Sequence, residues 1–178
     1  VELTPSGHIV VDRVSRTTVR GIYAAGDGTG VLPLAPGAAT QGRIAMWHAL
    51  GDAVAPLDVR RVPATVFTSP EIATVGISEA DAAAHDARVS VVPLARNPRA
   101  KMLGIHEGFV KVISREGSGS VLGGVVVGPR ASELIHVLTL AVATRTTVDQ
   151  LASAMTIYPS LSGSIAEGAR QLHTPVAD

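Results

Sequence analysis

The sequence predicts an α+β domain over residues 62–172, a mostly antiparallel sheet with packed helices, which follows the end of an α/β domain over residues 1–52. One observation is a strand-like run, a glycine-rich turn and a helix pattern that follow one another between residues 21 and 51. Another is the change beyond residue 62 to short β-rich runs, with most helix patterns after them. Between the two parts, residues 51–63 contain two prolines and an Arg-Arg pair, which indicates a connection.

The first candidate site lies where the run over residues 21–27 ends in Gly26-Asp27. A short apolar run bounded by turn residues is typical of a buried strand. In open α/β sheets, ligands bind just beyond the carboxyl ends of such strands. Gly26 would let a ligand approach the backbone, and Asp27 offers two acceptor oxygens to a hydroxyl-bearing ligand. The simpler interpretation, a strand followed by an Asp-Gly turn, stays open on spacing alone.

Before and after this run, the sequence predicts a hairpin-like region over residues 4–20 and a helix that begins near Pro36. Pro36 suits the first helical turn, where a missing N–H does no harm, and Gly51 suits the C-terminal cap. One face of this helix carries only small residues, so a strand or a flat ligand could pack close to it. These residues are Ala38, Gly42, Ala45 and Ala49.

In the second part, β-rich runs alternate with turn residues and then give way to helices. Strands are predicted over residues 65–67, 73–75, 89–94, 109–113 and 121–127. Helices are predicted over residues 79–86, over a segment with Leu134, Leu138, Ala141 and Val142 on one face, over 148–155 and from Ser160 to about Leu172. Thr147 and Gln150 have the spacing of a capping box.

Composition excludes several classes of function. The net charge of the 178 residues is zero and no basic block is present, which argues against nucleic acid or an anionic membrane surface as partner. No apolar stretch is long enough to span a bilayer, and the N-terminus lacks the pattern of a signal peptide. The sequence has no cysteine and six scattered histidines, so no metal site and no cysteine chemistry are predicted within it.

Several motifs in order resemble the pyridine nucleotide-disulfide oxidoreductases. Residues 18–27 resemble the family's second FAD-binding motif, and the resemblance implies that Gly26 and Asp27 lie at the ribityl chain of FAD. It also implies that the backbone of Leu34, Ala35 and Pro36 meets the flavin ring. The later motifs resemble the C-terminal dimerisation domain: residues 62–76, 97–100, 108–111, 122–124 and 127–135.

The resemblance implies a fragment of a longer flavoprotein. The family's first glycine loop, its redox cysteines and its nicotinamide-binding domain would precede Val1. Residues 1–52 would then be the C-terminal part of the FAD-binding domain, and NAD(P)H would be the co-substrate. A homodimer is expected, with the helix that bears Leu134, Leu138 and Val142 and the last helix, 161–172, as candidate interface. A cytoplasmic location is also expected.

One departure from the family pattern bears on the reaction. Disulfide reductases of this family carry a His-Pro-Thr motif and a Glu five residues after the His, whereas this sequence has Tyr158 and Gly163 at those positions. Histidine titrates near neutral pH and tyrosine near pH 10, so tyrosine is poorly suited to proton exchange with a thiol. The leading hypothesis is therefore electron transfer to a quinone-like acceptor, with Tyr158 in the acceptor pocket. The alternatives are a dihydrolipoamide dehydrogenase-like disulfide reductase that uses His173, and a non-catalytic dimerisation module.

Overall fold

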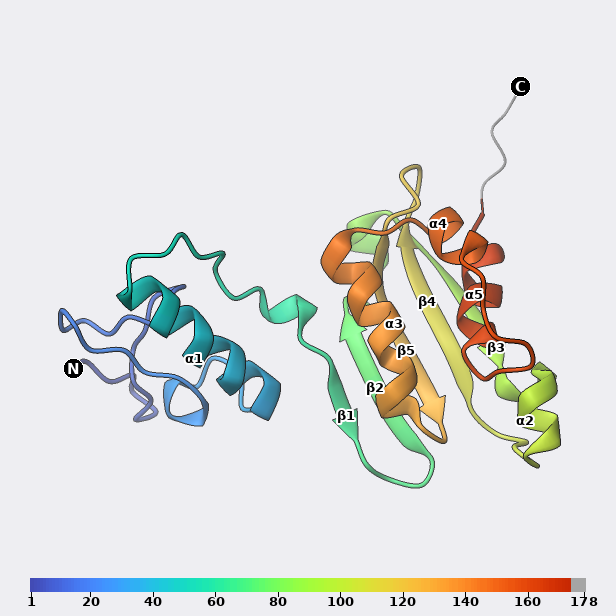
Figure 1. Ribbon diagram of the computed structural model, residues 1–178, viewed down its shortest axis with the longest axis horizontal. Coiled ribbons are helices and arrows are strands. Elements are labelled where there is room, and N and C mark those ends of the chain that lie inside the picture. Colours follow the sequence, from blue (N-terminus) through green and yellow to red (C-terminus); the bar gives the residue numbers. More distant parts are fainter. Residues whose placement is uncertain (174–178) are drawn as a thin grey trace. The chain divides into compact units, whose positions relative to one another are not determined.

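A computed structural model describes residues 1–173 as two compact units, one over Val1–Val62 and the other from Pro63 onward (Figure 1). The first unit contains one long helix and little regular strand. The second unit contains a five-stranded sheet and the remaining helices. Among residues 1–173, no helix is both long and apolar enough to cross a bilayer.

The predicted buried strand over residues 21–27 is wrong. The run makes a single antiparallel bridge, between Arg16 and Tyr23, and Ile22 is 46% exposed. The hairpin-like region before it is likewise held by isolated bridges, Leu3 with Ile9 and Val11 with Thr17. A buried strand needs parallel neighbours on both edges and cover on both faces, and the first unit provides neither.

The helix of the first unit is α1 (Ala35–Ala49), and the predicted start near Pro36 and end before Gly51 are confirmed. Pro36 lies in its first turn, and Gly51 follows its end with a φ of 92°. Only Ala45 of the small-residue face is buried, and a side chain at Gly42 would meet nothing within 4 Å. The buried face of α1 is instead the neighbouring one, which carries Gly37, Gln41 and Ile44. Two short 3₁₀ helices complete this unit, Asp27–Thr29 and Val59–Arg61.

The mostly antiparallel sheet predicted for the second unit is confirmed: every strand pair is antiparallel. The strand order, which was not predicted, is β1-β2-β5-β4-β3. The strands are β1 (Ala64–Val66), β2 (Glu71–Gly76), β3 (Ala87–Pro93), β4 (Phe109–Arg115) and β5 (Val121–Gly128). The central strand β5 carries Gly124, where a Cβ would stand 2.5 Å from a methyl group of Leu138. This glycine therefore lets a helix lie close against the sheet.

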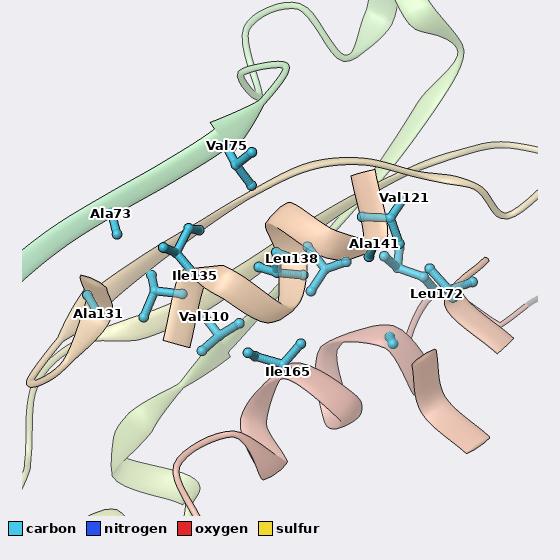
Figure 2. Close-up of a cluster of buried hydrophobic side chains, with 14 of the residues drawn as sticks. Ala73, Val75, Val110, Val121, Ala131, Ile135, Leu138, Ala141, Ile165 and Leu172 are labelled. Atoms are coloured by element: carbon cyan, nitrogen blue, oxygen red, sulfur yellow. The ribbon is translucent and has the colours of Figure 1, made fainter. Parts of the chain in front are cut away.

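Both major helices of this unit cover the same face of the sheet. They are α3 (Ala131–Thr144), which lies over β2 and β5, and α5 (Gly163–Arg170), which lies over β3 and β4 (Figure 1). Val112 and Gly124 are cross-strand partners, so their side-chain positions point to one face. Gly124 meets α3 and Val112 meets Gly168 of α5. Figure 2 shows Leu138, Val110 and Ile165, from α3, β4 and α5, within one apolar cluster.

The face of α3 that packs on the sheet differs in part from the predicted one. Leu138 and Ala141 are buried as expected, together with Ala131 and Ile135, whereas Leu134 and Val142 are only partly buried at the edge of the core. Leu138 is fully enclosed within its own unit, so in a dimer formed through this helix it would not be one of the contacting side chains. The helix as a candidate interface stays a prediction.

Other helix predictions are confirmed in part. The helix predicted over 79–86 is wrong: the segment forms turns and a 3₁₀ helix, Ala83–His85, which Asp86 ends at a φ of 48°. The capping box starts α4 (Val148–Ser153) as predicted. A further short helix, α2 (Pro98–Met102), follows a 3₁₀ turn, Leu94–Arg96, and was not predicted.

Candidate functional site

In the first unit, hydrogen bonds from one buried glutamine fix the loop that carries Gly26. Oε1 of Gln41 accepts the backbone N–H of Gly26 at 2.8 Å, and Nε2 of Gln41 donates to Oγ1 of Thr29 at 3.3 Å. The Thr29 hydroxyl donates in turn to the carbonyl oxygen of Gly26 at 2.8 Å. Gln41 is only 2% exposed, so both ends of its amide are used inside the unit. The sequence analysis missed Gln41, whose only signal was a polar residue four positions after Gly37 on the helix.

Gly26 has a conformation and surroundings that favour glycine. Its φ of 82° lies in the left-handed region. A Cβ at this position would stand 3.3 Å from Cβ of Ala38, so the loop runs close to the second turn of α1. The structure therefore brings Gly26 against the helix whose first turn holds Ala35 and Pro36.

The remaining predicted cofactor residues lie in this unit with free polar groups. Asp27 is exposed, and within residues 1–173 its carboxylate makes no hydrogen bond or ion pair. Leu34 is the N-cap residue of α1 and offers no side-chain cap, so the first N–H groups of the helix lack a side-chain partner. A free carboxylate and an uncapped helix start fit a ligand that carries hydroxyls and an electron-rich group, as FAD does.

In the second unit, a cavity of about 360 Å³ lies beside Tyr158. It is lined by the segment between β3 and α2, the segment that leads into α5, and one face of α5. Tyr158 is 81% exposed, so its ring stands at the cavity and not in the core of its own unit. The cavity is large enough for a small organic ligand.

One buried asparagine holds two walls of this cavity together. Asn97 is 7% exposed, and its Oδ1 caps α2 by accepting the backbone N–H groups of Arg99 and Ala100 at 2.8 and 3.2 Å. Its Nδ2 donates to the carbonyl oxygen of Ser160 at 2.9 Å and to Oγ of Ser164 at 2.8 Å. The position of the Tyr158 segment is therefore fixed from α2. Asn97 begins the segment 97–100, which resembles the dimerisation domain, but its part in joining these walls was not predicted from the sequence.

Gly163 begins α5 in the same cavity and leaves space there. A Cβ at this position would have its nearest neighbours, Nδ2 of Asn97 and Oγ of Ser160, at 3.9 Å. Ser160 precedes α5, and its Oγ accepts the backbone N–H of Gly163 at 3.2 Å. One turn further on, Glu167 pairs with Arg170 at 3.0 Å. Glu167 thus lines the cavity but is engaged by its own helix.

Comparison with known proteins decides the family. A family profile described as the dimerisation domain of the pyridine nucleotide-disulphide oxidoreductases matches residues 62–169, and a second profile of the same oxidoreductases matches residues 1–42. The chain belongs to the pyridine nucleotide-disulphide oxidoreductase family. This confirms the resemblance on which the sequence analysis relied.

The curated relatives of this chain include enzymes of two kinds. A protein of Mycobacterium tuberculosis named NAD(P)H dehydrogenase (quinone) is 55% identical over 174 residues, which are 97% of this chain and 35% of that protein. A dihydrolipoyl dehydrogenase of Halobacterium salinarum is 40% identical over 95% of this chain and 36% of its own length. The chain thus spans about a third of the length of the relatives it matches.

Solved structures agree with this assignment. The crystal structure of LpdA from M. tuberculosis matches 98% of this chain and 38% of its own, with a TM-score of 0.95 and 55% identity. The flavoprotein disulfide reductase RclA from Escherichia coli matches with a TM-score of 0.89 at 26% identity, over 97% of this chain and 40% of its own. The two units therefore have the local folds of this family.

His173, predicted as the alternative to the family's histidine, lies away from Tyr158 in the second unit. Nδ1 of His173 contacts Oδ1 of Asp149 at 2.6 Å, which ties the end of the described chain to α4. His173 does not line the cavity beside Tyr158. Within the described residues, no group of three or more potential ligands could hold a metal ion.

Proposed function

We propose that this chain is the C-terminal portion of an FAD-dependent NAD(P)H oxidoreductase that passes electrons to a quinone-like acceptor. The observation that carries the proposal is the cavity in which Tyr158 and Gly163 stand at the positions of the family's His and Glu. Glycine has no ionisable side chain, and the tyrosine side chain, with a reference pKa of about 10, is poorly suited to proton exchange with a thiol. Quinone reduction needs no such exchange: NAD(P)H, a proton and a quinone give NAD(P)⁺ and a hydroquinone. The quinone-reducing M. tuberculosis relative supports this choice.

In this proposal the first unit supplies part of the FAD site. Bound FAD would relay two electrons from NAD(P)H to the acceptor. The carboxylate of Asp27 would accept hydrogen bonds from the hydroxyls of the ribityl chain, and Gly26 would let the cofactor approach the backbone. The start of α1, with Leu34, Ala35 and Pro36, would offer N–H groups and partial positive charge to the flavin ring.

The second unit supplies the acceptor side. Tyr158 offers an aromatic face for stacking and a hydroxyl for hydrogen bonding to a carbonyl oxygen of the acceptor. Asn97 holds the segment that bears Tyr158, so the position of this segment would not change when an acceptor binds or leaves. Tyr158 is thus a binding residue of the proposed reaction.

A homodimer and a cytoplasmic location complete the proposal. The dimer would use apolar side chains that the second unit leaves exposed, among them Leu140 of α3, Met155 and Ile157. In a two-fold dimer each such patch meets the same patch of the other copy. Sedimentation of the 178-residue chain tests this directly, since a monomer at micromolar concentration would contradict it.

The cytoplasmic location follows from the need for NAD(P)H, and cell fractionation would check it.

The reaction is tested by assay of the full-length protein with NAD(P)H. Turnover is measured with a neutral 1,4-benzoquinone and, in parallel, with lipoamide and glutathione disulfide. We expect quinone turnover well above disulfide turnover. Disulfide reduction at a rate equal to the quinone rate would overturn the proposal.

The dihydrolipoyl dehydrogenase relatives favour one second candidate, a disulfide reductase in which another residue moves the proton. His173 is the histidine nearest in sequence to Tyr158, and Asp149 would orient its ring. Under this alternative, His173→Ala abolishes disulfide turnover of the full-length protein. Unchanged turnover in that variant excludes the alternative.

If the full-length protein turns over neither class of acceptor but dimerises, the chain is a non-catalytic dimerisation module.

A further inference from the structure

The cavity beside Tyr158 has an uncompensated positive charge. Its ionisable lining residues are Arg96, Tyr158, Glu167 and Arg170. Glu167 and Arg170 neutralise each other, because Nε and Nη2 of Arg170 both lie 3.0 Å from the Glu167 carboxylate. Arg96 makes no side-chain hydrogen bond or ion pair with any residue in the described part of the chain. The cavity therefore presents one free guanidinium to whatever enters it.

The backbone that carries Arg96 is fixed on both sides. Leu94, two residues before it, is completely buried in the core. The backbone N–H of Asn97, the next residue, donates to the carbonyl oxygen of Leu94 at 2.8 Å, and its side chain joins α2 to the Tyr158 segment. The side chain of Arg96 thus extends from a rigid base into solvent at the cavity, where it can turn toward a ligand.

We propose that the acceptors reduced at this cavity carry a permanent anionic group, a carboxylate or a sulfonate, and that Arg96 is the residue that binds it. This inference rests on the proposed function. A guanidinium binds such planar or forked anions through two parallel hydrogen bonds. The quinone ring would lie beside Tyr158 and take up two electrons from NAD(P)H and two protons, while the anionic substituent stays unchanged. Arg96 would therefore determine specificity and take no part in electron transfer.

The test compares two naphthoquinones in the full-length enzyme: neutral 2-methyl-1,4-naphthoquinone and anionic 1,4-naphthoquinone-2-sulfonate. The quantity measured is the ratio of kcat/KM for the anionic quinone to kcat/KM for the neutral one. We expect Arg96→Gln to lower this ratio about two- to fivefold, which is the upper part of the range for one exposed ion pair. The comparison between variants cancels the different intrinsic reactivities of the two quinones. Added salt should lower the wild-type ratio and leave that of Arg96→Gln nearly constant.

The matched control is Lys101→Gln, which removes the same charge from an exposed residue of α2 that does not line the cavity. Its ratio should equal that of the wild type. An equal fall in both variants would reveal a general effect of net charge and overturn the proposal, as would an unchanged ratio in Arg96→Gln.

Binding to the 178-residue chain separates this proposal from the proposed function. NMR spectra recorded with 1,4-naphthoquinone-2-sulfonate should show shifts of the amide signals of Arg96, Asn97 and Gly163, which weaken in Arg96→Gln. If the full-length enzyme fails to reduce any quinone but these shifts occur, the proposed function falls and the anion site stands. If quinones are reduced but the shifts and the ratio do not depend on Arg96, the anion site falls alone.

Discussion

The two units of this chain bury different kinds of residue. In Val1–Val62 the buried hydrophobic side chains are Ile44 and Ala45, and the buried polar ones are Ser15, Thr29 and Gln41. From Pro63 onward, an apolar cluster connects the sheet with α3 and α5. Hydrogen bonds thus hold the proposed cofactor loop of the first unit. In the second unit, hydrogen bonds of Asn97 join the walls of the cavity, but the unit as a whole is held by burial of apolar surface. Because each hydrogen bond contributes only about 1 kcal/mol net, the first unit has the smaller reserve of stability.

The strongest test of this contrast is on α3. Leu138→Ala removes a side chain that is fully enclosed between α3 and β5, and it should lower the free energy of unfolding of the second unit by about 3 kcal/mol. Leu140→Ala, two residues along the same helix, changes a side chain that is 61% exposed and should cost under about 0.5 kcal/mol in the monomer, where no partner subunit covers it. Urea unfolding followed by NMR measures both. Equal losses would mean that the exposed face of α3 is covered in solution.

Two glycines sharpen the comparison, one in each unit. Gly124→Ala places a methyl group 2.5 Å from Leu138 and 2.8 Å from the carbonyl oxygen of Lys111, so it should destabilise the second unit by about 1–3 kcal/mol. Gly42→Ala, on α1, meets nothing within 4 Å and should stabilise the first unit by about 0.5–1 kcal/mol. Amide hydrogen exchange resolves the two units. A loss of protection in α1 of the Gly42→Ala variant would contradict the open surface seen there.

Gln41 tests the role of hydrogen bonds in the first unit. Gln41→Ala leaves the N–H of Gly26 without its partner and should cost about 1–2 kcal/mol. Under the proposed function it should also weaken retention of FAD by the full-length protein, measured by flavin absorbance after gel filtration. Gln171→Ala is the control, since that amide makes one contact of 3.5 Å with Glu167 on the surface. Full FAD retention in Gln41→Ala would show that the loop keeps its shape without the glutamine.

The smallest expected effect is electrostatic. The backbone N–H and the hydroxyl of Ser132, at the start of α3, lower the pKa of Glu71 below its usual value by donating to its carboxylate. A carboxyl group whose pKa is lowered in the folded state stabilises the fold above its unfolded pKa. This contribution is lost as the pH falls through the folded pKa. Glu71→Gln should therefore reduce stability at pH 7 and change it little at pH 3, as thermal melts would show. An equal difference at both pH values would contradict this.

Local sequence signals were enough for elements that local residues determine. The limits of α1 followed from Pro36 and Gly51, and the start of α4 followed from the capping pair Thr147 and Gln150. The antiparallel sheet followed from short β-rich runs separated by turns. For α1 and α4 the stabilising residues lie close together in the sequence, whereas the sheet was predicted only as a class, since β2 pairs with the distant strand β5.

The errors concern contacts between distant residues. The run over 21–27 has the composition of a strand, but no neighbouring strands are present to pair with it. Asn97 binds residues 63 and 67 positions away, and Gln41 binds one 15 positions away, so neither role has a local pattern. The proposed role of Arg96 likewise depends on a distant contact, because Glu167 of α5 pairs with Arg170 and leaves Arg96 as the unpaired charge of the cavity. The motif of Tyr158 and Gly163 was found because it departs from a known pattern.

The open space at Gly163 bears on which residues this position of the cavity can accept. A Cβ there would meet no atom closer than 3.9 Å, and the backbone needs no glycine at this point because its φ is not in the left-handed region. Gly163→Ala is therefore expected to leave the fold intact. The residue at this position can thus be exchanged to vary the chemistry of the cavity while the start of α5 keeps its conformation.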